Sequence, residues 1–158
     1  MFYDAFSRNV NAVLDISTQL ARKTGCRYIG SEHLLFGLIN VPDGRAASIL
    51  KEAGVDSNRY LEYFKKTIDR NLIIPGNMFT PRTKGLLEKS IDISLKARSG
   101  FVGTEHLLLA ILLETDSCAV TILKAMRVNV DRMAEEIAES LLANIQNHEG
   151  AAEDATHV

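Results

Sequence analysis

The chain has 158 residues, of which 46% are hydrophobic and 24% are charged, so it is long enough to fill one core. Its net charge of −2 and isoelectric point near 6.1 argue against a nucleic-acid-binding protein, which carries a basic excess. No apolar run approaches the roughly 20 residues that span a membrane, and no apolar segment typical of a secretory signal opens the chain. Cys26 and Cys118 lack metal-site or redox spacing, which indicates idle thiols in the reducing cytoplasm.

Helical spacing of apolar residues dominates the first half of the chain. The pattern predicts a long helix over 5–24, which ends at Gly25, and a short helix over about 32–40. A third helix is expected over about 44–53. Asp56 is the expected N-cap of a fourth helix, because its carboxylate can accept a bond from the backbone of the first turn.

The segment 71–79, NLIIPGNMF, interrupts the helical pattern. Its Pro-Gly pair indicates a turn, but its apolar residues predict a connector that lies against the protein. Further helices are expected over about 80–98, after Thr104, over about 117–126 and over about 130–146. Since no segment has the alternating pattern of a strand, the sequence predicts an all-α protein of eight helices.

The two halves of the chain are copies of one unit. Residues 30–39 read GSEHLLFGLI and residues 103–112 read GTEHLLLAIL, so the offset is 103 − 30 = 73 positions. The same offset matches residues on both sides of the motif without a gap, among them Phe6 with Phe79, Leu14 with Leu87, Ser17 with Ser90, Asp43 with Asp116 and Val55 with Val128. The chain is therefore a tandem repeat of two four-helix units related by a pseudo-twofold axis.

These matches set the expected domain organisation. One domain is expected over 1–147, with its first repeat over about 5–70, the connector over 71–79 and its second repeat over about 80–146. The remaining residues, 148–158, have little to bury, and a disordered tail or linker is expected there.

Glu32 and Glu105 occupy the same place in the two copies of the motif. Ser31 and Thr104 are expected to cap the short helices, which puts each glutamate at the first helical position. A carboxylate there stabilises a helix by roughly 0.3–1 kcal/mol, so the pair can be helix-start residues and nothing more. Alternatively, the two are exposed anions in matching clefts, suited to a guanidinium or ammonium group. The residues alone leave both interpretations open.

His33 and His106 follow the two glutamates directly. Neighbouring positions point to different sides of a helix, and the HExxH pattern is absent, so the spacing does not indicate a metal site. We expect packed histidines with hydrogen-bonded ring nitrogens. The sequence also lacks a phosphate-binding loop, a nucleophile elbow and a dinucleotide-binding turn. The chain is therefore predicted to bind rather than to catalyse, without a cofactor or metal.

The starts of the two long helices form a second pair of candidate sites. They carry Ser7 and Arg8 in the first copy, and Thr80 and Arg82 in the second. A helix start offers free backbone N–H groups and partial positive charge, which suit an anion, although ordinary capping explains the same residues. If each helix start lies near the glutamate of its own repeat, a side chain with both a guanidinium and a phosphate would fit.

The duplicated G-[ST]-E-H-L-L motif, the FTPR turn at 79–82 and the length of the unit resemble the N-terminal repeat domain of Clp AAA+ unfoldases. The resemblance covers about residues 2–146 and is closest to the ClpC type. It implies a cytoplasmic domain on a hexameric ATPase ring, which recruits protein substrates and adaptor proteins for a partner peptidase. It also implies phosphoarginine recognition, with the guanidinium at Glu32 and Glu105 and the phosphate near the starts of the long helices.

The same resemblance implies an apolar patch where cyclic-peptide antibiotics bind, at positions that correspond to Phe2, Phe79, Lys84 and Glu88. It also implies that the isolated domain is a monomer. Because the sequence shows no ATPase module, the alternative is a free-standing Clp-repeat interaction protein that acts as an adaptor or decoy.

Overall fold

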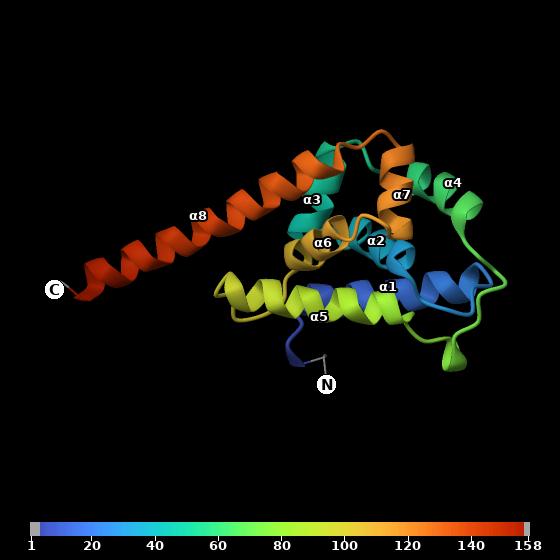
Figure 1. Ribbon diagram of the computed structural model, residues 1–158, viewed down its shortest axis with the longest axis horizontal. Helices are drawn as coiled ribbons and strands as arrows, with labels where there is room; N and C mark the ends of the chain where they lie inside the picture. The colour runs from blue at the N-terminus through green and yellow to red at the C-terminus, as the bar shows by residue number, and fades with distance from the viewer. Residues whose placement is uncertain (1–3, 157–158) are drawn as a thin grey trace.

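The computed structural model describes residues 4–156, with side chains described up to residue 147 (Figure 1). Over this range the chain forms eight α-helices and the short 3-10 turn η2. The elements are α1 (Arg8–Lys23), α2 (Ser31–Ile39), α3 (Arg45–Glu52), α4 (Ser57–Thr67), η2 (Pro75–Asn77), α5 (Pro81–Lys96), α6 (Thr104–Leu113), α7 (Cys118–Ala125) and α8 (Val130–Thr156). The predicted all-α repeat of two four-helix units is confirmed.

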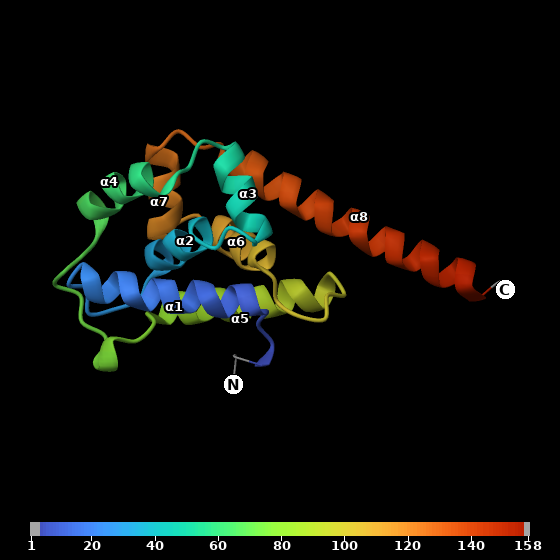
Figure 2. The ribbon, with the colours of Figure 1, turned by 180° about the vertical axis from the view of Figure 1, so that it is seen from behind.

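The short motif helices α2 and α6 stand at the centre of the fold. α2 packs on α1, α6 packs on α5, and the two central helices also contact each other. Figures 1 and 2 show α1 and α5 on one side of this pair, with α3, α4, α7 and the start of α8 on the other. The third helix of each repeat crosses over, since α3 packs on α6 and α7 packs on α2. The two repeats therefore interlock.

One apolar core joins both repeats. Both motif helices contribute fully buried side chains to it, among them Leu34 and Leu38 of α2 and Leu107, Leu108 and Ile111 of α6. Two separate small domains would each need a core of their own, so the repeats form a single folding unit. Among residues 4–156, no single helix has the length and apolar character to cross a membrane. Only α6 and α7 together reach that length and composition, and they are bent by 86°.

Most of the predicted helix ends are confirmed. Ser7, Asp56 and Thr80 cap α1, α4 and α5 by accepting backbone N–H groups of the first turn, at 3.2, 2.8 and 3.1 Å. Gly25, just after α1, has a φ of +73°, a left-handed conformation that glycine adopts without a steric penalty.

The connector lies against the protein, as predicted. The backbone N–H of Ile74 donates to the carbonyl of Arg27 at 3.0 Å, and the N–H of Ile29 donates to the carbonyl of Met78 at 3.0 Å. These bonds tie the connector to the segment between α1 and α2. Its apolar side chains are nevertheless largely open to solvent, since Ile73 is 57% exposed and Met78 is 52% exposed.

The end of the chain differs from the expectation. A helix that ends near 146 and a disordered tail after it are expected, whereas α8 continues to Thr156 and projects from the body (Figure 1). Alanine and glutamate recur after His148, and both are among the stronger helix formers. Local helix propensity accounts for the extension, although this stretch has few apolar residues to bury.

Candidate functional site

At the N-termini of the motif helices, the motif histidines rather than the hydroxyl residues accept backbone N–H groups. Gly30 and Gly103 occupy the N-cap positions of α2 and α6. The Nδ1 atom of His33 accepts the N–H of Gly30 at 2.9 Å, and the Nδ1 atom of His106 accepts the N–H of Gly103 at 2.8 Å. Both side chains are buried. The prediction of packed histidines is confirmed, and each ring is hydrogen-bonded through Nδ1, whereas Nε2 of His33 has no hydrogen-bond partner among the described residues.

The motif hydroxyl groups cap helices of the opposite repeat. Ser31 Oγ accepts the backbone N–H of Ala119 in α7 at 3.1 Å, and Thr104 Oγ1 accepts the N–H of Ala46 in α3 at 3.2 Å. The prediction that Ser31 and Thr104 cap their own helices is therefore wrong. Because the third helix of each repeat starts against the other repeat's motif, the hydroxyl group is in reach of that helix.

Glu32 faces the interior. The residue is 5% exposed, and its carboxylate accepts a hydrogen bond from Tyr28 Oη at 3.0 Å. Burial and then the Glu32 charge raise the pKa of the Tyr28 hydroxyl, and the same two causes raise the pKa of the Cys118 thiol. The carboxylate is thus enclosed by neutral groups that keep their protons. The expectation that both motif glutamates are exposed in matching clefts is wrong for Glu32.

Aromatic side chains of α4 fill the space beside Glu32. Tyr60 and Phe64 are fully buried, and Tyr60 Oη donates to the backbone carbonyl of Glu32 at 2.6 Å. Arg59 closes this side further, because its guanidinium donates to the carbonyls of Gly54 and Met126, each at 3.1 Å. Nothing the size of a guanidinium can reach Glu32 without moving this packing.

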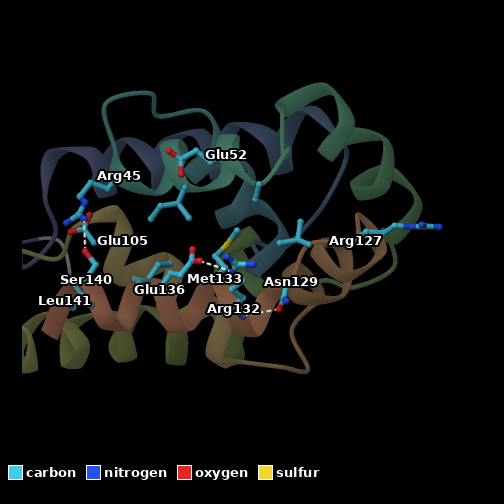
Figure 3. A pocket seen from close by; sticks show the side chains of 14 residues that line it. Arg45, Glu52, Glu105, Arg127, Asn129, Arg132, Met133, Glu136, Ser140 and Leu141 are labelled. Atoms are coloured by element: carbon cyan, nitrogen blue, oxygen red, sulfur yellow. Dashed lines mark hydrogen bonds and ion pairs between the residues drawn. The ribbon is translucent and has the colours of Figure 1, made fainter. Parts of the chain in front are cut away.

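The equivalent place in the second repeat is an open pocket of about 500 Å³ between α3 and α8, here called the α3–α8 pocket (Figure 3). Its apolar lining consists of Ile49, Ala53, Val128, Met133, Ile137 and Leu141. Its charged lining consists of Arg45, Glu52, Glu105, Arg127, Arg132 and Glu136. Equal numbers of arginine and glutamate over an apolar floor suit a side chain or peptide segment that combines an apolar stem with charged groups.

Glu105 lies in the α3–α8 pocket. Its side chain is 16% exposed, against 6% for the side chain of Glu32. Arg45 enters the pocket from α3, and its Nη2 atom donates to Ser140 Oγ of α8 at 3.0 Å. Figure 3 shows Arg45, Glu105 and Ser140 together at one end of the pocket, whereas Arg127 points away. A carboxylate and a guanidinium are therefore available to one ligand.

The offset of 73 positions explains why one site is closed and the other is open. Where repeat one has Tyr60 and Phe64, repeat two has Met133 and Ile137. These side chains lack the aromatic rings that fill the space beside Glu32, and α8 does not pack on α3 in the way that α4 packs on α7.

The polar groups around the two glutamates differ as well. Cys118 beside Glu32 corresponds to Arg45, and Tyr28 corresponds to Phe101, which has no hydroxyl group and is 63% exposed. Arg132, the counterpart of Arg59, pairs with Glu136 at 3.0 Å. Sequence drift between the copies has thus left only Glu105 with charged neighbours in a pocket.

The starts of the long helices lie next to the opposite repeat. The N–H of Ser7 donates to the carbonyl of Val102 at 2.9 Å, and the N–H of Thr80 donates to the carbonyl of Ile29 at 3.1 Å. Val102 and Ile29 lead into α6 and α2 respectively. The condition set for a combined site, that each helix start lies near the glutamate of its own repeat, is therefore not met, because the repeats interlock at this point too.

The candidate arginines of the long helices lie outside the α3–α8 pocket. Arg8 is exposed, and Arg82 donates to the backbone carbonyl of Asp116 at 2.6 Å. Neither these arginines nor Ser7 and Thr80 line the pocket that contains Glu105. The arginine beside Glu105 in that pocket is Arg45, which the sequence analysis did not select.

The chain matches the family described as Clp repeat (R) N-terminal domain over residues 5–74 and 78–157. The two matched stretches correspond to the two structural repeats. The chain belongs to this family. Clp repeat N-terminal domains are binding domains of Clp ATPases, and the chain is not itself catalytic.

Among curated relatives, the chain is 29% identical over 145 residues to the negative regulator of genetic competence ClpC/MecB of Bacillus subtilis. The match covers 91% of the chain but spans only 18% of that relative's length. Among solved structures, the N-terminal domain of ClpD from Arabidopsis thaliana has a TM-score of 0.75 at 18% identity, with 89% of this chain and 97% of that chain covered. A complex of a ClpV N-domain with a VipB peptide has a TM-score of 0.68 at 16% identity, with 90% of each chain covered.

The apolar patch implied by the resemblance to Clp domains stays a prediction. Phe2 lies outside the described residues. Phe79 is half-buried and packs against the small cluster that contains Cys26, Tyr28 and Ile29. Lys84 and Glu88 are exposed on α5.

Arg45, Met133, Ile137 and Ser140 are site residues that the sequence analysis missed. Each stands where the two Clp repeats differ, opposite Cys118, Tyr60, Phe64 and Thr67. Because residues matched between copies mark the shared fold, the mismatched positions around a matched glutamate were the available signal for a site present in one repeat only.

Proposed function

We propose that this chain is the substrate- and adaptor-recognition domain of an ATP-dependent Clp unfoldase of the ClpC type. It binds protein segments and delivers them to an ATPase ring and its peptidase, which belong to the remaining length of such proteins. The names of the curated relatives, among them an ATP-dependent Clp protease ATP-binding subunit, support this role. The peptide complex of the ClpV N-domain supports protein segments as the class of ligand.

We further propose that the α3–α8 pocket binds the phosphoarginine side chain of a marked protein. Glu105 accepts hydrogen bonds from the guanidinium, and Arg45 pairs with the phosphate. Charge-assisted bonds of this kind are about twice as strong as neutral ones, which makes the pair a sound basis for recognition. The single observation that carries the proposal is the placement of Glu105 and Arg45 in one open pocket.

The floor of the α3–α8 pocket supports the same ligand. Ile49, Ile137 and Leu141 line the same pocket as the charged pair, and the stem of an arginine side chain is itself apolar. The volume of about 500 Å³ lies within the range of roughly 300–1,000 Å³ typical of small-molecule sites. The pocket can therefore accept a side chain together with a short stretch of its backbone.

The test is an NMR titration of the chain with free phosphoarginine. The proposal predicts amide shifts at Arg45, Ile49, Glu105 and Ser140, with smaller changes elsewhere. Glu105→Ala should remove the shifts, because the guanidinium loses its acceptor. Glu139→Ala is the matched control, since Glu139 is an exposed glutamate of α8 that does not line the pocket. Shifts confined to the starts of α1 and α5 would contradict the proposed site.

A further inference from the structure

We propose that Arg45 determines which ligands the α3–α8 pocket accepts. As a resident cation beside Glu105, it disfavours ligands that carry only a positive charge and favours those in which an anionic group lies next to the guanidinium. The inference rests on the proposed function, because it concerns the same pocket, and it names the residue responsible for selecting the phosphorylated side chain.

The cross-repeat cap fixes Arg45 relative to Glu105. Thr104 Oγ1 accepts the N–H of Ala46, which brings the first turns of α6 and α3 together. Glu105 follows Thr104 and Arg45 precedes Ala46, so both lie at this junction. Both line the same pocket, and Figure 3 shows their side chains beside one another. Their proximity is thus set by backbone geometry rather than by a flexible surface contact.

Ser140 holds the guanidinium in place. Arg45 Nη2 donates to Ser140 Oγ at 3.0 Å, which joins α3 to α8 across the pocket. An arginine has five N–H donors, so one bond to a hydroxyl group leaves others for an anion. The guanidinium is therefore positioned and still able to pair with a phosphate.

The first repeat shows that the fold itself places the position of Arg45 beside the motif glutamate. The counterpart of Arg45 is Cys118, whose thiol lies close enough to Glu32 for that charge to raise the pKa of the thiol. A neutral thiol beside a buried carboxylate gives a closed, inert site. An arginine in the same place supplies the positive charge that a doubly charged ligand requires.

The selection follows from Coulomb interactions. A ligand with a lone guanidinium meets the attraction of Glu105 and the repulsion of Arg45, which nearly cancel at similar distances. An isolated phosphate meets the opposite pair of forces. A phosphorylated guanidinium can direct its N–H groups to Glu105 and its phosphate oxygens to Arg45. Arg132 and Glu136 of α8 also line the pocket. They pair with each other at 3.0 Å, so they do not alter the balance between the attraction of Glu105 and the repulsion of Arg45.

The experiment measures the affinities of arginine, inorganic phosphate and phosphoarginine for the wild-type chain, Arg45→Ala and Glu105→Gln. Arg45→Ala should bind phosphoarginine at least tenfold more weakly and arginine at least threefold more tightly. Glu105→Gln should bind phosphate at least threefold more tightly. Arg22→Ala is the control, because Arg22 is an exposed arginine of α1 that does not line the pocket, and all three affinities should be unchanged.

The two proposals fail in different ways. Absence of phosphoarginine binding to the wild-type chain would overturn the proposed ligand. Equal arginine affinity in the wild-type chain and Arg45→Ala would overturn the role of Arg45, whatever the phosphoarginine result. Arg45 is exposed, so Arg45→Ala should keep the fold, and a circular dichroism spectrum checks this. Arg45→Cys, which installs the residue of the first repeat, should reproduce the alanine result.

Discussion

Thr104 of the second repeat accepts the backbone N–H of Ala46 in the first repeat, and the equivalent bond joins Ser31 to Ala119. Each motif thus caps a helix that belongs to the other repeat. This relationship explains why a hydroxyl residue precedes the glutamate in both copies, although the glutamates have different surroundings. The hydroxyl residue serves the fold, and the residue before the capped N–H, Cys118 or Arg45, supplies a neutral or a charged neighbour to the glutamate.

Removal of either cross-repeat cap should destabilise the whole domain. Ser31→Ala and Thr104→Ala each leave a buried backbone N–H without a partner, at an expected cost of about 1–2 kcal/mol in the free energy of unfolding. Thr104→Ser keeps the acceptor and should lie within about 0.5 kcal/mol of the wild-type chain. Urea unfolding measures the differences. Equal stability of Thr104→Ala and Thr104→Ser would contradict the capping role.

Acid should destabilise the domain through His33. Burial lowers its pKa from the ordinary 6.5 to about 4. Its Nδ1 atom already accepts the N–H of Gly30, and Nε2 has no hydrogen-bond partner among the described residues, so nothing supports a charged ring. Glu32 Oε1 lies 3.8 Å from Nδ1 but does not change this, since protonation there would break the bond to Gly30.

The direction of the pH dependence follows from proton binding. Between pH 6.5 and about 4 the unfolded chain binds more protons at His33 than the folded chain does. The contribution of His33 to the free energy of unfolding is therefore complete above pH 6.5 and falls by up to about 3 kcal/mol as the pH is lowered to 4. His33→Gln keeps an acceptor for Gly30 but cannot titrate. Urea unfolding from pH 7 to 4 should show a shallower slope for this variant, and an identical slope would refute the assignment.

The helix pattern and the duplication allowed most of the fold to be predicted, because both depend on local sequence. The long helix that opens each repeat and the caps at Asp56 and Thr80 follow from apolar spacing and from residue types with one dominant role. The interlocking of the repeats could not be predicted in this way. It depends on which surfaces of Ser31, Thr104 and the long-helix starts meet in space, and a sequence pattern does not contain that pairing.

Arg127 should weaken the fold through its backbone conformation. It follows α7 with a φ of +64°, whereas its counterpart Gly54 follows α3 with a φ of +82°. A left-handed conformation costs a residue with a side chain roughly 1–2 kcal/mol, and glycine offsets part of the gain through unfolded-chain entropy. Arg127→Gly should therefore raise the free energy of unfolding by about 0.5–1 kcal/mol in thermal unfolding. Arg127→Ala, which keeps the strain, should not, and equal effects of the two would contradict the argument.

Aromatic residues from the first repeat should close the pocket of the second. Met133→Tyr with Ile137→Phe installs the side chains of Tyr60 and Phe64, and the new hydroxyl group can donate to the carbonyl of Glu105. The variant should lose phosphoarginine binding while its free energy of unfolding rises by about 1 kcal/mol, because more apolar area is buried.

Calorimetric titration and urea unfolding test this double variant. Leu142→Phe is the control, since Leu142 is 58% exposed on α8 and does not line the pocket. Retention of ligand affinity in a folded double variant would show that the pocket is not the binding site.

The different surroundings of Glu32 and Glu105 could not be predicted from the sequence. Identical motifs predict identical roles, so Glu32 and Glu105 received the same interpretation. Their roles differ because Tyr60 and Cys118, in other helices, occupy the space and supply the neighbours of Glu32. The substitutions were visible in the sequence, but their meaning depends on the cross-repeat packing.

The most direct test of a single ligand site at Glu105 is calorimetric titration of phosphoarginine into the wild-type chain, Glu32→Gln and Glu105→Gln. Both substitutions preserve shape and remove one negative charge. We predict one ligand per wild-type chain, unchanged affinity in Glu32→Gln and a loss of at least tenfold in Glu105→Gln. Two ligands per chain, or an equal loss of affinity in both variants, would contradict the account.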